Sequence, residues 1–575
     1  MVMIELCHRP KLLHIGYSPS RSRAIPDRQQ RTVVILKGSP HRTTGHDVQI
    51  PTMTLTNRSA SIHQTSCRKT RRLAPLISVP IALLLFSACQ PDQGQASSGD
   101  RAQAEAGAGR VSGTGDPYAV EAEAPAGYDR EVGADAARRH LEALIRINTE
   151  NPPGNELGTA RYFDSVLAPF AGVERHVLEA APGRANFVAR LRAGNATGRP
   201  VLVMGHMDVV GADTTRWTTP PFEPTEADGY LYGRGAMDDK GMLASTLAVL
   251  EQLAAQRDRL TRDIIFVATA AEEGGPSIGI DWLMEHHAAL LTDAEFALNE
   301  GGRIRVRDGG IATVNVQTTE KIPYVLELKA EGTGGHGSVP LPDNPLAALA
   351  RAVERVHEWK VPARLNETTR IYFSKLADVE PDETMARAMR EISDPSSGTR
   401  VFARADSILS TDPLHNAVLR PGASLTILDG GFRSNVIPGE GSAKFSFRVL
   451  PDDDVPALME QLRAVVAEPG VTANLDSDPE EAPEVSPVTT ALYQAMENSA
   501  VIMSPGVTVI PFMSTGATDG AVLRAAGIPT YGILPFPLIM EDELRMHGDN
   551  ERIPVKSIGW ATEFVYRVLH EVSGQ

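Results

Sequence analysis

The chain has 575 residues, of which 42% are hydrophobic and 22% charged, and its formal net charge is −16. This length exceeds one compact core and predicts two or more domains. An acidic surface repels phosphate backbones, which argues against nucleic acid as a partner. The three cysteines, Cys7, Cys67 and Cys89, precede the region with globular patterning, so disulfides, a cysteine zinc site and thiol catalysis are excluded there.

The segment that ends at Cys89 has the layout of an export signal. A basic cluster at 68–72 precedes an apolar run at 73–86 that is short for a membrane span. Its Ser-Ala-Cys ending resembles a bacterial lipoprotein signal, in which the cysteine carries the lipid, although Phe86 stands where leucine is usual. We therefore expect residues 53–89 to direct export to the periplasm, with a lipid anchor at Cys89. A plain signal peptide and an apolar anchor are the alternatives.

The segments on either side of this signal have no folded pattern. Residues 1–52 lack apolar periodicity and precede a signal that normally begins a chain, so we expect Met53 to be the native start and 1–52 a non-native extension. Residues 90–128, rich in Ala, Gly, Gln, Ser and Glu, are expected to form a flexible linker.

Helical and strand patterns alternate from residue 134 onward. The helical patterns are 134–147 and 242–256, and the short apolar runs are 199–210, 262–275 and 294–302. This order predicts an α/β fold with a mainly parallel sheet and helices on both faces. Ligand sites in such sheets lie at the carboxyl ends of the strands. Most of the unusual polar clusters of the chain follow these apolar runs.

The pattern changes near residue 320. Segments 324–332, 423–431 and 442–450 alternate apolar and polar residues, as half-solvated antiparallel strands do. They predict an α+β domain at 320–478, inserted into a sheet domain formed by residues 129–319 and 479–575.

Five clusters contain the candidate chemistry, and the first is His206 with Asp208. These side chains point to the same side of an extended segment, and the carboxylate can hold the second nitrogen of a metal-bound imidazole. Taken alone, the pair also fits a satisfied histidine at a strand end. The other clusters contain Asp238 between glycines, the pair Glu272 and Glu273, Glu300, and His547.

Two further properties of these clusters favour a metal site. An acid at the start of a helix, such as Asp238, could be present only because its negative charge is favourable at the positive end of the helix dipole. Adjacent glutamates, however, repel each other and are costly to bury without a cation. Two histidines and three carboxylates without sulfur suit catalytic zinc, with cobalt or manganese as other fits.

In this order the motifs resemble the co-catalytic zinc peptidases of the M20 group, over roughly residues 130–575 and most closely the carboxypeptidase S and Gly-X branch. The resemblance implies two zinc ions, with Asp238 shared between them and a cis peptide bond between Asp238 and Asp239. The implied roles form one set: His206 and Glu300 bind one zinc, Glu273 and His547 bind the other, Glu272 is the general base, and Asp208 is the partner of His206.

The resemblance also implies a substrate side. His336 would stabilise the oxyanion and, in dimeric members, reach into the partner's active site; the alternative is a loop histidine between glycines. Arg448 and Asn435 would bind the carboxylate and carbonyl of the substrate, since the planar guanidinium pairs well with a carboxylate. A solvent-facing strand arginine is the alternative for Arg448. Gly516 and Thr518 would form a further substrate-side loop.

These features predict an exported metallopeptidase of the carboxypeptidase type, acting on an amide bond next to a free C-terminal carboxylate. Glu272 would activate a water held between the metals. The alternatives are an N-acyl-amino-acid amidohydrolase and, from another class, a non-catalytic binding lipoprotein, which the intact ligand set disfavours. The expected partners are a small peptide or N-acyl amino acid and a second copy in a homodimer. Alternatively, the long insertion between His336 and Asn435 would let a single chain supply the residues that a dimer partner otherwise contributes to the active site, so that no dimer is needed.

Overall fold

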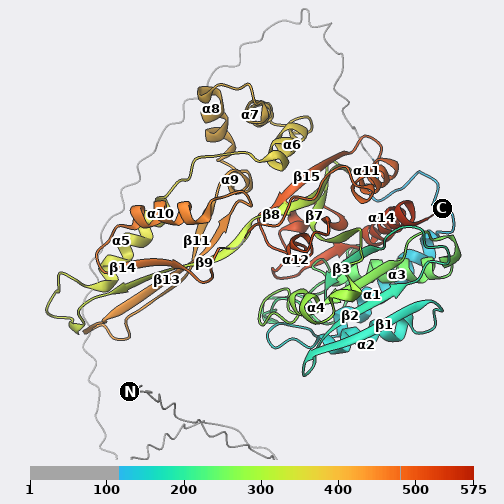
Figure 1. The fold of residues 1–575 in the computed structure, drawn as a ribbon, viewed down its shortest axis with the longest axis horizontal. Helices are drawn as coiled ribbons and strands as arrows, with labels where there is room; N and C mark the ends of the chain where they lie inside the picture. The colour runs from blue at the N-terminus through green and yellow to red at the C-terminus, as the bar shows by residue number, and fades with distance from the viewer. Residues whose placement is uncertain (1–114, 480, 575) are drawn as a thin grey trace, which may run out of the picture. The chain divides into compact units, whose positions relative to one another are not determined.

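The computed structural model describes residues 115–479 and 481–574 (Figure 1). The predicted extension and the predicted signal with Cys89 lie outside these residues. Within the described ranges, no helix is long and apolar enough to cross a membrane.

The described part of the predicted linker packs against α14 (Val555–Ser573). Asp116 forms an ion pair with Lys556, and the ring of Tyr128 lies 4.5 Å from the ring of Tyr566. Tyr128 is 7% exposed, so the chain begins to bury apolar surface before its first helix.

The largest feature is an eight-stranded sheet with a parallel centre. Its strands, in spatial order, are β1 (Val173–Ala181), β2 (Arg184–Leu191), β6 (Ile264–Thr269), β3 (Val201–His206), β7 (Phe296–Arg307), β16 (Thr530–Leu538), β8 (Gly310–Glu320) and β15 (Thr508–Ser514). The pairs β6–β3, β3–β7, β7–β16 and β8–β15 are parallel, whereas β1–β2 and β2–β6 are antiparallel. The mainly parallel sheet predicted from the apolar runs is confirmed.

The central strands are buried on both faces, which explains their continuous apolar runs. Val201 and Val203 of β3 belong to one hydrophobic cluster, and Leu202 and Met204 belong to a second. The first cluster includes side chains of α1 (Arg130–Arg146), α2 (Glu156–Leu167), α3 (Lys240–Ala254), α11 (Ala491–Met503) and α14. The second includes those of α4 (Ile280–His286) and α12 (Gly520–Ala525). The predicted helices on both faces are therefore present.

Strand β16 lies between β7 and β8, although β7 and β8 also pair directly farther along. The strands approach closely at glycines: a Cβ on Gly532 would lie 2.4 Å from the carbonyl oxygen of Glu300, and one on Gly302 would lie 2.0 Å from that of Asn315. Side chains at these two positions would force the strands apart.

A second sheet of four strands follows β8 in the chain. Its order is β11 (Gly422–Gly430), β13 (Glu440–Val449), β9 (Ile322–Glu331) and β14 (Val471–Leu475), all antiparallel. Helices α5 (Pro345–Glu358) and α10 (Val455–Val466) share a hydrophobic cluster with this sheet. Two short strands, β10 (Gly335–His336) and β12 (Val436–Ile437), pair beside it. We call residues 322–475 the inserted segment.

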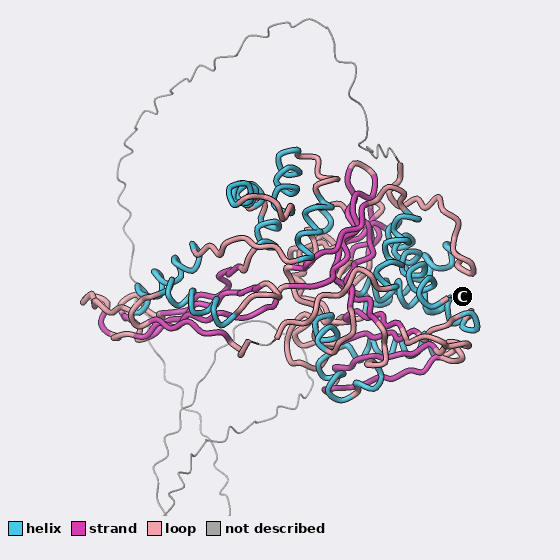
Figure 2. The backbone as a smooth tube through the Cα atoms, turned by 45° about the horizontal axis from the view of Figure 1, so that its top comes forward, coloured by secondary structure: helices cyan, strands magenta, loops and turns pink. Residues whose placement is uncertain are grey.

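The inserted segment also contains four helices with no strand between them, visible as cyan coils joined by loops in Figure 2. They are α6 (Glu367–Leu376), α7 (Glu383–Ser393), α8 (Thr399–Leu409) and α9 (Pro413–Leu419), and we call them the helical group. Their buried side chains form one cluster with Ile510, Phe512 and Met513 of β15.

Smaller elements complete the fold. They are the sheet of β17 (Arg552–Pro554), β5 (Tyr230–Tyr232) and β4 (Thr225–Ala227), the helix α13 (Met540–Glu543), and the 3-10 turns η1 (Arg257–Arg259) and η2 (Ala288–Leu290).

Candidate metal centre

Histidine and acid side chains lie on or just after three adjacent parallel strands. His206 ends β3, Glu272 and Glu273 follow β6, and Glu300 lies in β7. Because parallel strands end at one edge of the sheet, their last side chains lie close together. The carboxyl edge of β6, β3 and β7 is therefore the floor of the site.

The carboxylate of Asp238 lies between two histidines. Its Oδ1 is 2.9 Å from Nε2 of His206, and its Oδ2 is 3.1 Å from Nε2 of His547. The second histidine also lies 3.0 Å from Oε1 of Glu273. Asp238 precedes α3 and forms a cis peptide bond with Asp239, as expected. Four of the five predicted ligands are thus in direct contact, although they come from four distant parts of the chain.

The donor atoms fit a divalent cation. One donor each from His206, Asp238 and Glu273 lie within 4.8 Å of one another. Burial, together with the nearby carboxylate of Asp238, raises the pKa of Glu300 to about 8. Burial likewise raises the pKa of Glu272 well above its usual value, with Glu300 contributing. A buried excess of carboxylate beside imidazole nitrogen is the arrangement that a bound cation stabilises.

Asp208 connects the strand ends to the loop after β6. Its carboxylate accepts hydrogen bonds from the backbone N–H groups of Glu272 and Glu273, both at 3.1 Å, and from the amide of Asn151 at 2.8 Å. Nδ1 of His206 lies 2.9 Å from the backbone carbonyl oxygen of Asp208 and 3.7 Å from the carboxylate of the same residue. Asp208 therefore holds the second nitrogen of His206 through its backbone carbonyl rather than through the carboxylate expected for this role, and its carboxylate positions the glutamate pair.

The loop that contains Asp238 is fixed by a buried ion pair that the sequence motifs did not assign. Glu551 accepts hydrogen bonds from Nη1 of Arg234 at 2.8 Å and from the N–H groups of Gly235, Met237 and Asp238 at 3.0, 2.7 and 3.2 Å. The guanidinium also donates to the carbonyl of Gly548 at 2.9 Å. Glu551 thus holds the two ligand loops together. Glu551 lies four residues after His547, in the same sequence cluster, and this proximity is the only sequence signal that could have indicated its role.

Two further acids, one fully buried and one half-buried, had no predicted role. Asp239 is fully buried, and a Cβ on Gly205 would lie 2.0 Å from its Oδ2, so the glycine before His206 makes room for this carboxylate. Asp519 accepts a hydrogen bond from the hydroxyl of Thr269 at 2.6 Å, and burial raises its pKa to about 7.

The predicted oxyanion residue lies in the inserted segment. His336 is exposed and pairs in register with Val436, next to Asn435, whose carbonyl accepts from Gly337 at 2.8 Å. The backbone N–H of Ser338 donates to Nδ1 of His336 at 3.2 Å. The structure thus brings His336 and Asn435 together, and among the described residues neither forms a hydrogen bond or ion pair with the metal-centre acids.

The other predicted substrate residues lie near the connection between the two sheets. Arg448 is half-buried, and its Nη1 is buried without a hydrogen-bond partner among the described residues. Thr518 donates through its N–H and hydroxyl to Glu320 at 3.0 and 2.9 Å. Gly516 is exposed and donates only to the hydroxyl of Ser514 among these residues, at 3.1 Å. The hydroxyl of Thr518 is therefore already engaged within the protein.

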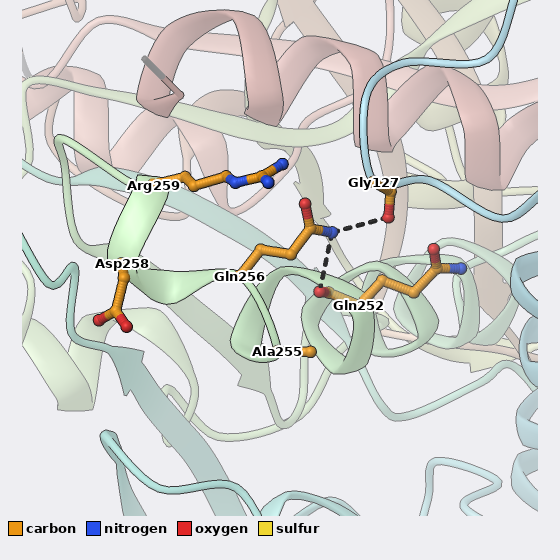
Figure 3. A pocket seen from close by; sticks show the side chains of 6 residues that line it. All are labelled: Gly127, Gln252, Ala255, Gln256, Asp258 and Arg259. Carbon is orange, nitrogen blue, oxygen red and sulfur yellow. Dashed lines mark hydrogen bonds between the residues drawn. The ribbon is translucent and has the colours of Figure 1, made fainter.

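A hollow of about 580 Å³ elsewhere on the surface contains none of these residues (Figure 3). It is lined by Gly127, Gln252, Ala255, Gln256, Asp258 and Arg259, and the amide of Gln256 already donates to the carbonyls of Gly127 and Gln252.

A histidine and carboxylate donor set at the carboxyl edge of a parallel sheet places the protein among metal-binding α/β enzymes. Residues 202–571 match Peptidase family M20/M25/M40. The chain belongs to this family, and it is therefore a hydrolase.

Similar proteins support this assignment. A probable carboxypeptidase S-like 2 of Dictyostelium discoideum is 30% identical over 387 residues, which cover 64% of this chain and 71% of the relative. The human N-fatty-acyl-amino acid synthase/hydrolase PM20D1 is 29% identical over 382 residues, covering 64% and 74%. The crystal structure of the M20 family metallo-carboxypeptidase Sso-CP2 from Sulfolobus solfataricus has the same fold, with a TM-score of 0.58 at 19% identity, covering 75% of this chain and 98% of that one.

Proposed function

We propose that the protein is a metallopeptidase of the carboxypeptidase type, which hydrolyses an amide bond next to a free carboxylate. The observation that supports it most is the position of Asp238, whose two oxygens face two different histidines. Such a carboxylate fits between two cations. The residues that would hold them are His206 with Glu300 on one side and His547 with Glu273 on the other. Nitrogen and oxygen donors without sulfur favour zinc, and cobalt or manganese also fit.

Bound divalent cations would supply Lewis acidity, which makes water more acidic and polarises a carbonyl. Glu272 is the carboxylate available for proton transfer, because Asp208 fixes its backbone and no side-chain partner within the described ranges engages its oxygens. It would accept a proton from the attacking water and return it to the leaving amine.

Two residues of the inserted segment would hold the substrate. Nη1 of Arg448 has no hydrogen-bond partner in the described part of the chain, and the planar guanidinium suits the free carboxylate. Nδ1 of His336 accepts from Ser338, so the proton of the neutral ring lies on Nε2. Nε2 would donate to the carbonyl oxygen as negative charge develops on it.

A second candidate is an N-acyl-amino-acid amidohydrolase. The similarity to the N-fatty-acyl-amino acid hydrolase PM20D1 favours it. Both candidates need the same donors and the same carboxylate anchor, and they differ only in the group on the acyl side.

We also propose that the protein is exported and anchored through Cys89, on the basis of the sequence pattern at 68–89. Radiolabelled palmitate incorporation that Cys89→Ala abolishes would support the anchor, and unchanged incorporation would contradict it.

A homodimer is proposed from the edge strand β11, on which Leu425, Ile427 and Leu428 are 42%, 54% and 63% exposed. Light scattering of the purified protein measures the mass, and a monomer at all concentrations would contradict this proposal.

The experiment that tests the enzymatic proposal combines metal analysis with a panel of dipeptides and N-acyl amino acids. We expect about two zinc ions per chain and cleavage within the panel. Glu272→Ala should keep the metal and lose activity by about 10²-fold or more. Glu285→Ala, the same change at a 77% exposed side chain, is the matched control. A fully active Glu272→Ala variant would refute the general-base assignment, and a protein that takes up no metal would refute the whole proposal.

A further inference from the structure

The helical group is attached to both sheets. Its cluster includes Phe512 of β15, and its last helix is held by Lys321, which connects β8 to β9. Nζ of Lys321 donates to the carbonyl oxygens of Ala417 and Arg420 at 2.9 and 2.8 Å. The helices therefore have a fixed position beside the start of the second sheet.

A pocket of about 750 Å³ lies where these parts meet. Ser407 comes from α8 and Ser410 follows that helix, the second sheet contributes Ser446 and Arg448, and Thr515 comes from the loop after β15. The pocket therefore includes the arginine proposed as the carboxylate anchor. The hydroxyls of Ser410 and Ser446 already have partners in Asp406 and Arg448. The hydroxyls of Ser407 and Thr515 have none among the described residues, so this part of the wall suits a polar group.

The charges of the lining side chains are unbalanced. Asp406 is the only acid among them, and it already forms an ion pair with Arg420. The ammonium of Lys321 is engaged by two carbonyls. Lys360 and Arg448 remain, and neither forms an ion pair with any residue in the described ranges. In a protein of net charge −16, this pocket thus contains two cations without a carboxylate partner.

We propose that this pocket selects an acidic residue on the carboxylate side of the scissile bond. Arg448 pairs with the free α-carboxylate, and Lys360 pairs with the side-chain carboxylate. The inference rests on the proposed function for the role of Arg448 and adds the substrate class and Lys360 as the residue that determines it. Lys360 lies in the loop between α5 and α6, and the helical group supplies another part of the pocket wall.

Binding of free amino acids to the metal-loaded full chain tests this inference without turnover. L-Glutamate and L-glutamine have the same shape and differ in one charge. We expect glutamate to bind about tenfold more tightly or better in isothermal titration calorimetry, the effect of one charge-assisted hydrogen bond. Lys360→Ala should reduce glutamate binding to the level of glutamine and leave glutamine binding unchanged. Lys329→Ala removes an exposed lysine of β9 that does not line the pocket, and it should change neither.

Three results would overturn the inference: equal binding of the two amino acids, binding of neither, or a preference that survives Lys360→Ala. The binding test and the cleavage assay can fail independently of each other. If no dipeptide or N-acyl amino acid is cleaved but the glutamate preference depends on Lys360, the pocket assignment stands and the enzymatic proposal fails. If glycyl-glutamate and glycyl-glutamine are cleaved equally well, the enzymatic proposal stands and the selection of an acidic residue fails.

Discussion

Glu551 offers the sharpest test of how the metal centre is built. The residue is fully buried and accepts four hydrogen bonds, one from Arg234 and three from backbone N–H groups of the Asp238 loop. Glu551→Ala leaves a buried guanidinium and these N–H groups unpaired. Removing one partner of a buried ion pair costs about 3–5 kcal/mol of the free energy of unfolding. Glu551→Gln keeps the shape and one acceptor oxygen, so we expect a smaller loss of about 2 kcal/mol.

The same change should weaken metal binding, because residues that orient ligands typically account for about 10–100-fold in metal affinity. Urea unfolding with and without a chelator measures the stability, and zinc competition measures the affinity. Glu226→Gln is the matched control: its ion pair with Arg138 has both side chains more than 40% exposed, so it should cost less than about 1 kcal/mol. If Glu551→Gln unfolds and binds zinc like the unchanged protein, the reasoning about the two loops is wrong.

Three further predictions concern other parts of the structure. His336→Ala should lower kcat by about 10²-fold or more while the free energy of unfolding changes by less than about 0.5 kcal/mol, because the side chain is exposed; steady-state kinetics and urea unfolding check this. Burial lowers the pKa of Lys321 from 10.5 to about 8, so between these pH values the unfolded chain holds more protons and stability should rise with pH. Lys321→Met should flatten that rise in pH-dependent unfolding, and an unchanged slope would contradict it. Gly205→Ala should lower stability by about 1–3 kcal/mol, because its Cβ would lie 2.0 Å from Oδ2 of Asp239; thermal unfolding measures the loss.

The large sheet and the metal centre were predictable because their signals are local. Strands β3 and β6 are short apolar runs that end in or are followed by a candidate ligand, and in β7 Glu300 comes soon after the apolar residues that begin the strand. Once the runs are recognised as parallel strands, the rule that their carboxyl ends meet brings His206, Glu273 and Glu300 together. The role of His547 as a ligand could be predicted only from the family resemblance, because nothing in the sequence near residue 547 indicates that this histidine contacts Asp238.

The contacts that hold these ligands were not predictable in the same way. Glu551 and Asn151 act through backbone N–H groups and side chains distant in the sequence, and such pairings leave no periodic pattern. The helical group was missed within the predicted α+β insertion for a related reason. Its helices are short and amphipathic, and their role depends on packing against β15 and on two carbonyls that accept from Lys321.

The position of β16 has a consequence for how the chain matures. The strand fits between β7 and β8, which are more than 200 residues ahead of it, and His547 lies just beyond it. A chain cut short before residue 530 would therefore expose two apolar strand edges with no partner, which is a template for pairing between molecules. It would also lack one histidine donor. Tight metal uptake should accordingly report that synthesis and folding are complete, so that truncated products are both metal-poor and prone to aggregate.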